Sequence, residues 1–232
     1  MPCLAGQTAP FDPLGRKNSM LNQSKIKAIV FDWDGVIVDS MPMAALVIQA
    51  TAASYGVQIS VEKILATYFQ PKEAFYKSIG IEIKDFNELD KRQAANDNKY
   101  LFNSHPTLFS DVLRTLQKLK DRRFILGVGT QRNHDNIQNE VEMRGLQAFF
   151  PAENLFGGFQ TKEEMLIFLI KKMDVASDEL IYVDDLPSGI TTARKVGAKS
   201  AAISRHESGK ARLKAERPDY FLDSLSDLLT IL

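Results

Sequence analysis

Residues 29–40 read IVFDWDGVIVDS, an apolar run that ends in two aspartates and a glycine. Because successive side chains of a strand alternate between its faces, Asp32 and Asp34 are expected to point the same way from a strand end. Two carboxylates held this close repel, so proteins that keep such a pair usually bind a metal ion or divide the pair into an acid and a base. Turns also use Asp and Gly, but open parallel sheets bind ligands at the carboxyl ends of their strands. The stretch therefore predicts a functional site.

Length and charge narrow the class of protein. The 232 residues can form one large domain, or a core domain with a modest insertion. Basic and acidic residues number 29 each, so no global positive field attracts nucleic acid or an anionic membrane. No apolar run approaches the roughly 20 residues that cross a bilayer. We expect the protein to bind a small molecule and to need neither nucleic acid nor a membrane. We also expect it to be a monomer or a homodimer.

The single cysteine, Cys3, excludes an internal disulfide and a cysteine-based metal cluster, and favours a reducing compartment. It lies in residues 1–24, where prolines and glycines occur without a sustained apolar period, as in a flexible leader. This segment lacks the continuous apolar stretch of a secretory signal. The sequence predicts a cytoplasmic protein.

Apolar periodicity predicts two kinds of organisation along the chain. From residue 106 onward, helices are expected at 110–120, 133–144, 161–173, 187–196 and 224–229, and strands at 124–129, 155–156, 179–183, 200–203 and 220–222. Strands that alternate with helices imply crossover units and a parallel sheet. Before residue 106, helices alone are expected after the first strand, at 41–54, 60–69, 71–79 and 85–102.

The predicted fold is therefore α/β, a doubly wound parallel sheet with a small all-helical cap domain inserted after its first strand. Residues 25–40 and 106–232 are assigned to the core domain and residues 41–105 to the cap. We expect the cap to cover the carboxyl edge of the sheet.

Three other strand ends bring complementary groups to that edge. Thr130 follows a buried strand and precedes Gln131 and Arg132, so a hydroxyl and turn amides suited to a phosphate oxygen face the carboxylates. A threonine that caps the next helix is an equally good interpretation of this segment alone. Lys162 opens a helix where partial positive charge already accumulates, which favours an anionic partner, although solvated surface lysines are common.

Asp184 and Asp185 end the strand before a Leu-Pro-Ser-Gly turn, and form a second pair of carboxylates at a strand end. Hard oxygen ligands in this number suit Mg²⁺, which prefers one or two carboxylates, water and a substrate phosphate. A helix cap explains only one of the two aspartates.

At this point the chain resembles the haloacid dehalogenase-like hydrolase superfamily, in its phosphatase branch with a small helical cap. The resemblance covers about residues 26–232 and is carried by FDWDGV at 31–36, Thr130, Lys162 and VDDLPSGI at 183–190. It implies a Rossmann-like core. The first and last motifs are specific signatures, whereas the middle two gain weight from their order and spacing.

The resemblance also implies the roles of the aspartates. Asp32 would be the nucleophile that becomes an aspartyl phosphate, and Asp34 the general acid and base. Mg²⁺ would be held by the side chain of Asp32, the backbone carbonyl of Asp34, and Asp185, with Asp184 acting directly or through water. A metal ion and a cation are needed because a carboxylate and a phosphate dianion repel each other.

The phosphoryl group would be bound by Thr130, Gln131, Arg132 and Lys162. One position departs from the pattern of many members, which carry an aspartate where this chain has Gly189. The chain instead looks like the phosphoglycolate phosphatase and β-phosphoglucomutase relatives, which use an adjacent acidic pair.

The leading hypothesis is a Mg²⁺-dependent phosphoric monoester hydrolase that acts on a small phosphorylated metabolite, with phosphoglycolate or a sugar phosphate as examples implied by resemblance. A phosphomutase of the β-phosphoglucomutase type and a non-catalytic binding protein on the same scaffold are the alternatives. Substrate choice is expected in the cap, where cations could reach an anion, although a solvated charged face is the ordinary interpretation of Lys72, Lys77, Lys84, Lys91 and Arg92.

Overall fold

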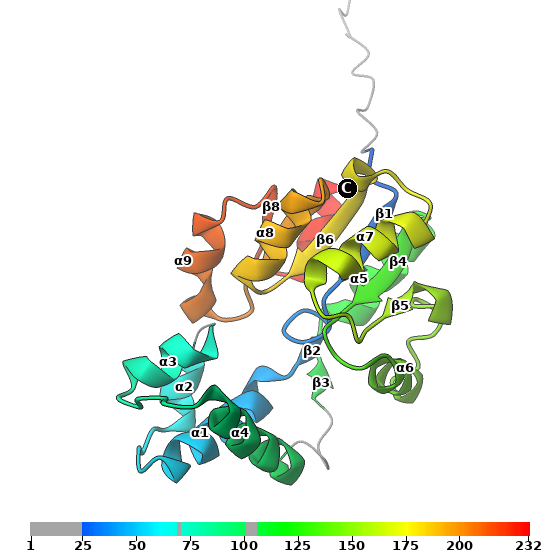
Figure 1. Cartoon of the computed structure of the whole chain (residues 1–232). Helices are drawn as coiled ribbons and strands as arrows, with labels where there is room; N and C mark the ends of the chain where they lie inside the picture. Colours follow the sequence, from blue (N-terminus) through cyan, green and yellow to red (C-terminus); the bar gives the residue numbers. More distant parts are fainter. Residues whose placement is uncertain (1–24, 69–70, 101–105) are drawn as a thin grey trace, which may run out of the picture.

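The computed structural model describes residues 25–68, 71–100 and 106–232 (Figure 1). Six parallel strands form the main sheet in the order β5-β4-β1-β6-β7-β8. Their bounds are β1 Ala28–Phe31, β4 Ile125–Gly129, β5 Leu155–Phe156, β6 Leu180–Asp184, β7 Lys199–Ile203 and β8 Tyr220–Leu222.

Strand β1 lies at the centre of the sheet because its four apolar residues are buried on both faces. Phe31, its last residue, pairs with Val128 of β4 and with Val183 of β6. The carboxyl ends of β1, β4 and β6 therefore lie side by side, and the polar residues that follow them meet at one edge.

Helices cover both faces of the sheet. Ile29 and Phe31 pack with one set of helices, and Ala28 and Val30 pack with the other. The first set comprises α5 Val112–Asp121, α6 His134–Met143, η3 Leu225–Asp227 and α10 Leu228–Ile231. The second comprises α7 Lys162–Lys172, α8 Pro187–Lys195 and α9 Glu207–Ala215, while η1 Ala152–Asn154 and η2 Ser177–Glu179 precede β5 and β6. This arrangement confirms the predicted α/β doubly wound fold.

Four helices follow the first strand and form a group of their own in Figure 1, α1 Met41–Ser54, α2 Val61–Thr67, α3 Lys72–Ser78 and α4 Phe86–Tyr100. They share an apolar cluster in which Ile48, Phe75 and Leu89 are buried. The chain passes to and from this group through an antiparallel pair of short strands, β2 Val38–Asp39 and β3 Thr107–Leu108. The helical content agrees with expectation, while the division into domains at 41 and 105 stays a prediction.

Two features differ from the elements expected from periodicity. Helix α9 has no apolar period. Among its described side chains Leu213 is the one that is buried, and it packs with Ile190 and Ala202. The pair β2 and β3 has two residues in each strand, too few to show an alternation. The predicted leader and the ends of two predicted helices, at 69 and 101–102, lie outside the described residues.

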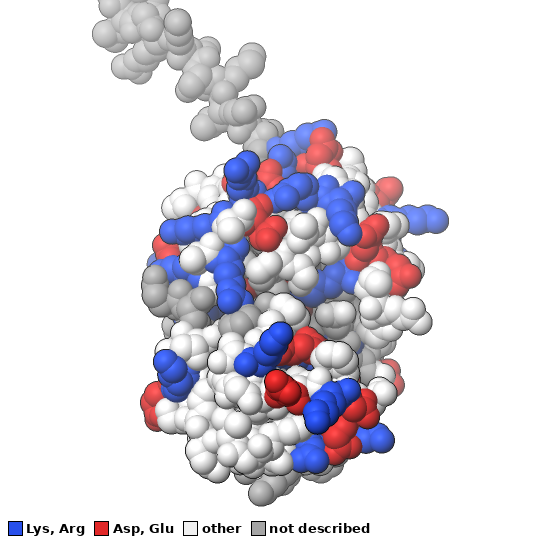
Figure 2. Space-filling model, turned by 60° about the vertical axis from the view of Figure 1, so that its left-hand side comes forward, with Lys and Arg blue, Asp and Glu red and all other residues white. Residues whose placement is uncertain are grey.

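The surface agrees with the balanced composition. On the face that Figure 2 shows, basic and acidic side chains are interspersed rather than gathered by sign. Among the described residues, no helix combines the length and the apolar character that a membrane span requires.

Candidate active site

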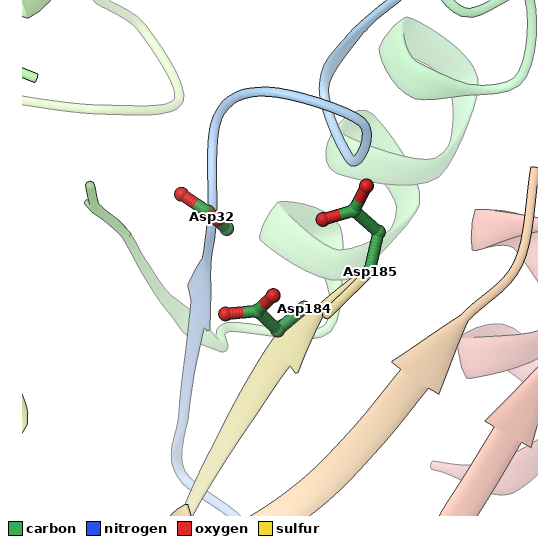
Figure 3. Close-up of side chains that lie close together, drawn as sticks. All are labelled: Asp32, Asp184 and Asp185. Carbon is green, nitrogen blue, oxygen red and sulfur yellow. The ribbon is translucent and has the colours of Figure 1, made fainter. Parts of the chain in front are cut away.

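Three carboxylates gather at the carboxyl edge of the sheet, as Figure 3 shows. Asp32 follows β1, Asp184 ends β6 and Asp185 comes next along the chain. Each offers an oxygen, and these oxygens all lie within 4.8 Å of one another. Asp32 is 6% exposed and Asp184 is fully buried. The structure thus brings together two motifs that are about 150 residues apart in the sequence.

Lys162 supplies a positive charge to this cluster from the first turn of α7. The helix begins there because Thr161 caps it, its side chain accepting a hydrogen bond from the backbone N–H of Glu164. Lys162 Nζ donates to Asp32 Oδ2 at 3.0 Å and also to the Asp184 carboxylate. Burial alone lowers the pKa of this ammonium, but the charges of Asp184 and Asp32 raise it well above its usual value.

The carboxylates carry more negative charge than Lys162 can balance. Burial and the charge of Asp184 raise the pKa of Asp32 to about 6, against the lowering effects of Lys162 and of the Trp33 backbone N–H, which donates to Asp32. Burial, and then the charges of Asp184 and Asp32, raise the pKa of Asp185 well above its usual value. Three clustered carboxylates, two of them buried, against the one ammonium that Lys162 supplies call for a further cation. Their oxygens fit the preference of Mg²⁺.

Asp34 lies two residues beyond Asp32 and is held by Arg132. The guanidinium binds the carboxylate through both oxygens, with Nε to Oδ2 and Nη2 to Oδ1 both at 2.6 Å. Gly35 makes the turn possible, because its φ is +73° and a Cβ there would lie 2.0 Å from Asp185 Oδ2. The structure thus places Arg132, predicted to bind the phosphoryl group, against the predicted general acid.

The other residues predicted after β4 differ in position. Thr130 is 2% exposed, its backbone N–H donates to the Phe156 carbonyl at 3.0 Å, and its Oγ1 accepts from the Arg132 backbone N–H at 3.3 Å. Gln131 is exposed and does not line the cavity described below. The structure therefore places Arg132 at the cavity, buries Thr130 beside it at the end of β4, and leaves Gln131 on the surface.

The structure explains why position 189 is a glycine, where many family members carry an aspartate. A Cβ at this position would lie 2.0 Å from Asp184 Oδ2. Asp184 is fixed there because its Oδ1 accepts from the Leu186 backbone N–H at 2.8 Å. The glycine lets α8 approach the Asp184 carboxylate closely.

A cavity of about 360 Å³ opens over this edge. Asp32, Asp34, Asp185 and Arg132 line its floor. Other wall residues come from α1, from α2 and the residue after it, from the segment between β7 and α9, and from α9 itself. They include Met41, Ala44, Leu65, Tyr68, Ser204, Arg205, His206, Gly209, Arg212 and Leu213.

The wall after β7 was not expected from the sequence. Its signal is the polar run of Ser204, Arg205 and His206, which follows a strand at the same edge as the other motifs. The predicted cap cations do not line the cavity. Lys72 pairs with Asp90 and Arg92 with Glu88, while Lys77, Lys84 and Lys91 are exposed.

The family model of the haloacid dehalogenase-like hydrolases matches residues 29–203, a span that contains all four motifs. The chain belongs to this family of hydrolases, which confirms the resemblance found in the motifs.

Two curated relatives and one solved structure extend this result. The chain is 26% identical to pyrophosphatase PpaX of Bacillus pumilus over 217 residues, covering 91% of this chain and 98% of that protein. It is 26% identical to phosphoglycolate phosphatase of Synechococcus elongatus over 207 residues, covering 88% and 96%. The haloacid dehalogenase-like protein SP0104 of Streptococcus pneumoniae has a similar fold, with a TM-score of 0.74 at 20% identity over 89% of this chain and 98% of that one. Together with the family match, these relatives support the predicted enzyme class, a phosphoric ester hydrolase.

Proposed function

We propose that the protein is a Mg²⁺-dependent phosphatase that hydrolyses a small phosphorylated metabolite through an aspartyl phosphate on Asp32. One observation carries the proposal, the buried Asp32 carboxylate that shares Lys162 with Asp184 at the end of the central strand. Such a group is shielded from water and faces a cation. These are the conditions in which a carboxylate can approach a phosphate.

The metal would be held by Asp32, Asp184 and Asp185, with the backbone carbonyl of Asp34. When bound, Mg²⁺ neutralises phosphate charge and so lowers the repulsion between substrate and nucleophile. Lys162 adds a fixed positive charge beside the attacking oxygen, and Thr130 offers a hydroxyl to the phosphoryl group.

The chemical steps follow from the positions of the two aspartates. A carboxylate oxygen of Asp32 attacks phosphorus, the bond from phosphorus to the leaving oxygen breaks, and Asp34 gives that oxygen its proton. Asp34 then takes a proton from water, whose oxygen attacks phosphorus. The bond from phosphorus to the Asp32 oxygen breaks, which releases inorganic phosphate and the free Asp32 carboxylate. The protein ends each cycle unchanged.

Arg132 has to change partners during this cycle. While its guanidinium donates to both oxygens of Asp34, both oxygens are occupied as acceptors and neither can face a leaving oxygen. A phosphoryl oxygen that takes over a hydrogen bond from Arg132 would free one Asp34 oxygen to deliver a proton. Arg132 would then anchor the substrate, as the sequence predicts.

The substrate is expected to be small, because the cavity of about 360 Å³ lies near the lower end of the range for ligand pockets. The curated relatives are named for pyrophosphate and phosphoglycolate, so both compounds belong in the first substrate panel. A cytoplasmic location, and a monomer or homodimer that needs no nucleic acid or membrane, are further parts of the proposal.

The test is phosphate release from an aryl phosphate and from a panel of metabolite phosphates, with and without Mg²⁺. We expect Asp32→Asn to lower kcat by on the order of 10³-fold or more, because it removes the nucleophile. Asp223→Asn, which changes an exposed aspartate, is the matched control. In heavy-oxygen water, the native enzyme should place the label in the released inorganic phosphate and none in the Asp32 carboxylate, because water attacks phosphorus and not the carbonyl carbon.

Near-native phosphate release by Asp32→Asn would contradict the proposal. Phosphoryl transfer between sugar positions without release of inorganic phosphate would favour the phosphomutase alternative. A folded protein that binds Mg²⁺ and does neither would favour a non-catalytic role.

A further inference from the structure

Arg205 lies just after β7, outside all four motifs, and its side chain is 9% exposed. Its Nη2 donates to the backbone carbonyl of Val36 at 3.0 Å, across 169 residues of sequence. Val36 belongs to the loop that carries Asp34, two residues away. A buried arginine from one strand end therefore contacts the loop that follows another.

Backbone hydrogen bonds join the two ends of that loop, but they do not involve the carbonyl at its tip. The Trp33 carbonyl accepts from the N–H groups of Ile37 and Val38 at 3.0 and 3.1 Å, and the Gly35 N–H donates to the Val38 carbonyl at 2.9 Å. These bonds leave the carbonyl of the buried Val36 to Arg205. Because an unpaired buried carbonyl is costly, the bond holds the loop tip in one position.

The guanidinium is itself fixed from other sides. Its Nη1 donates to Asp111 Oδ2 at 2.7 Å, and its central carbon lies 4.0 Å from the centroid of the Phe109 ring. The same Asp111 oxygen accepts from Ser224 Oγ and from the Leu225 N–H, both at 2.7 Å. A planar group that is stacked on one face and hydrogen-bonded along its fork has little freedom to move.

These contacts also join the two points where the chain passes to and from the inserted helices. Val36 precedes them, and Phe109 and Asp111 follow them. The Phe109 N–H donates to the Ile37 carbonyl at 3.2 Å, so the loop and the returning chain are already neighbours. Arg205 ties both to the end of β7.

We propose that Arg205 is a positioning residue, which holds the Asp34 loop where Asp34 can protonate the leaving oxygen. The proposal rests on the proposed function, because it acts through the acid role of Asp34. A small displacement of a catalytic group can cost about 10²-fold in rate. Arg205 also lines the cavity, so direct contact with the substrate is the competing role.

The experiment compares Arg205→Lys and Arg205→Met with the native enzyme on two esters. A nitrophenyl phosphate leaves without needing a proton, whereas an alkyl phosphate depends on the acid. The value of kcat/KM reports transfer of the phosphoryl group to Asp32, the step in which the leaving oxygen is protonated. We expect kcat/KM on the alkyl ester to fall about 10- to 100-fold, and on the nitrophenyl ester by less than about threefold. In Arg205→Lys the ammonium cannot reproduce the planar pair of hydrogen bonds made by the guanidinium. This variant should therefore retain more of the alkyl-ester activity than Arg205→Met, but less than the native enzyme.

Asp219→Asn is the matched control at the opposite end of β7. Asp219 accepts from the Ser200 N–H, Ser200 Oγ and Lys199 Nζ, each at 2.9 Å, a set comparable to that of Asp111. This variant should lower the melting temperature without changing the ratio of kcat/KM between the alkyl ester and the nitrophenyl ester. Asp111→Asn, which leaves Arg205 present but loosens its anchor, should separate them in the same direction as Arg205→Met.

The outcomes distinguish the two proposals. Equal losses on both esters, or a rise in KM on both at constant kcat, would overturn the positioning role. If the Arg205 variants do not fold, Asp111→Asn decides, and its failure to separate the esters overturns the role. A native enzyme that releases phosphate from neither ester would overturn the proposed function itself.

Discussion

Single residues at the site are held by buried charges that depend on one another. Lys162 bonds to both Asp32 and Asp184, and each of these carboxylates raises its pKa. Removing one member of a buried pair leaves an uncompensated charge, which typically costs about 3–5 kcal/mol. The shape of the neighbouring backbone therefore matters, because it decides where each carboxylate can lie.

Gly189→Ala tests this dependence. The new Cβ would need the space of Asp184 Oδ2, 2.0 Å away, so Asp184 has to move and its bonds to Lys162 and Leu186 weaken. We expect a loss of about 1–3 kcal/mol in the free energy of unfolding and a fall of roughly 10²-fold in kcat, measured by urea unfolding and phosphate release. Gly209→Ala is the control for stability, because its Cβ would meet nothing closer than Ser204 Oγ at 3.7 Å. Equal stability of the two variants would contradict the expectation.

At the scale of elements, Asp111 joins the start of α5 to two distant segments. Arg205, after β7, and Ser224 and Leu225, near the carboxyl end, all donate to it. Burial raises the pKa of Asp111, but the hydrogen bonds from Arg205 and Ser224 outweigh it and leave the pKa below its usual value. The junction is thus stabilised by the charged form of one carboxylate.

The pH dependence of stability follows from that sign. A pKa lowered in the folded state means that Asp111 stabilises the protein above its unfolded pKa of about 3.9, and that this contribution is lost as the pH falls through the folded value. We expect Asp111→Asn to cost about 2 kcal/mol at pH 7 and progressively less as the pH falls below about 4 towards the folded pKa. Urea unfolding of both proteins across this range measures the difference. A difference that does not change with pH would show that charge is not its source.

At the scale of the whole molecule, the cavity lies where separate parts of the chain meet. Its floor comes from the ends of β1 and β6, and its walls from α1, α2 and the start of α9. Helix α2 contacts α9, so the inserted helices reach the core beside the cavity, as Figure 1 shows. A ligand or metal ion bound there would link the inserted helices to the sheet.

Mg²⁺ is therefore expected to stabilise the folded chain. At a hundred times its Kd, a single bound ion adds about 2.7 kcal/mol, or roughly 5–10 °C in melting temperature for a chain of this size. Asp185→Asn should melt higher than the native protein in EDTA, because one repelling charge is gone, and should lose most of the increase with Mg²⁺. Thermal unfolding with Mg²⁺ and with EDTA tests both. An unchanged increase in the variant would remove Asp185 from the metal site.

The local pattern of apolar residues was enough to predict much of the fold. Helix and strand periodicity predicted the parallel sheet and nearly every helix, because apolar residues that face a core repeat with the period of their own element. Periodicity did not predict helix α9, because Leu213 is the one buried residue among its described side chains.

For the site, the sequence by itself determined which side chains follow β1, β4 and β6, and hence that Asp32, Thr130 and Asp184 come to one edge. Only the tertiary structure decided that Arg132 binds Asp34, 98 residues away, and that Arg205 reaches Val36, 169 residues away. The physical reason is that residues after a strand end have no period of their own. Their partners are set by the order of strands in the sheet and by the direction that each turn takes.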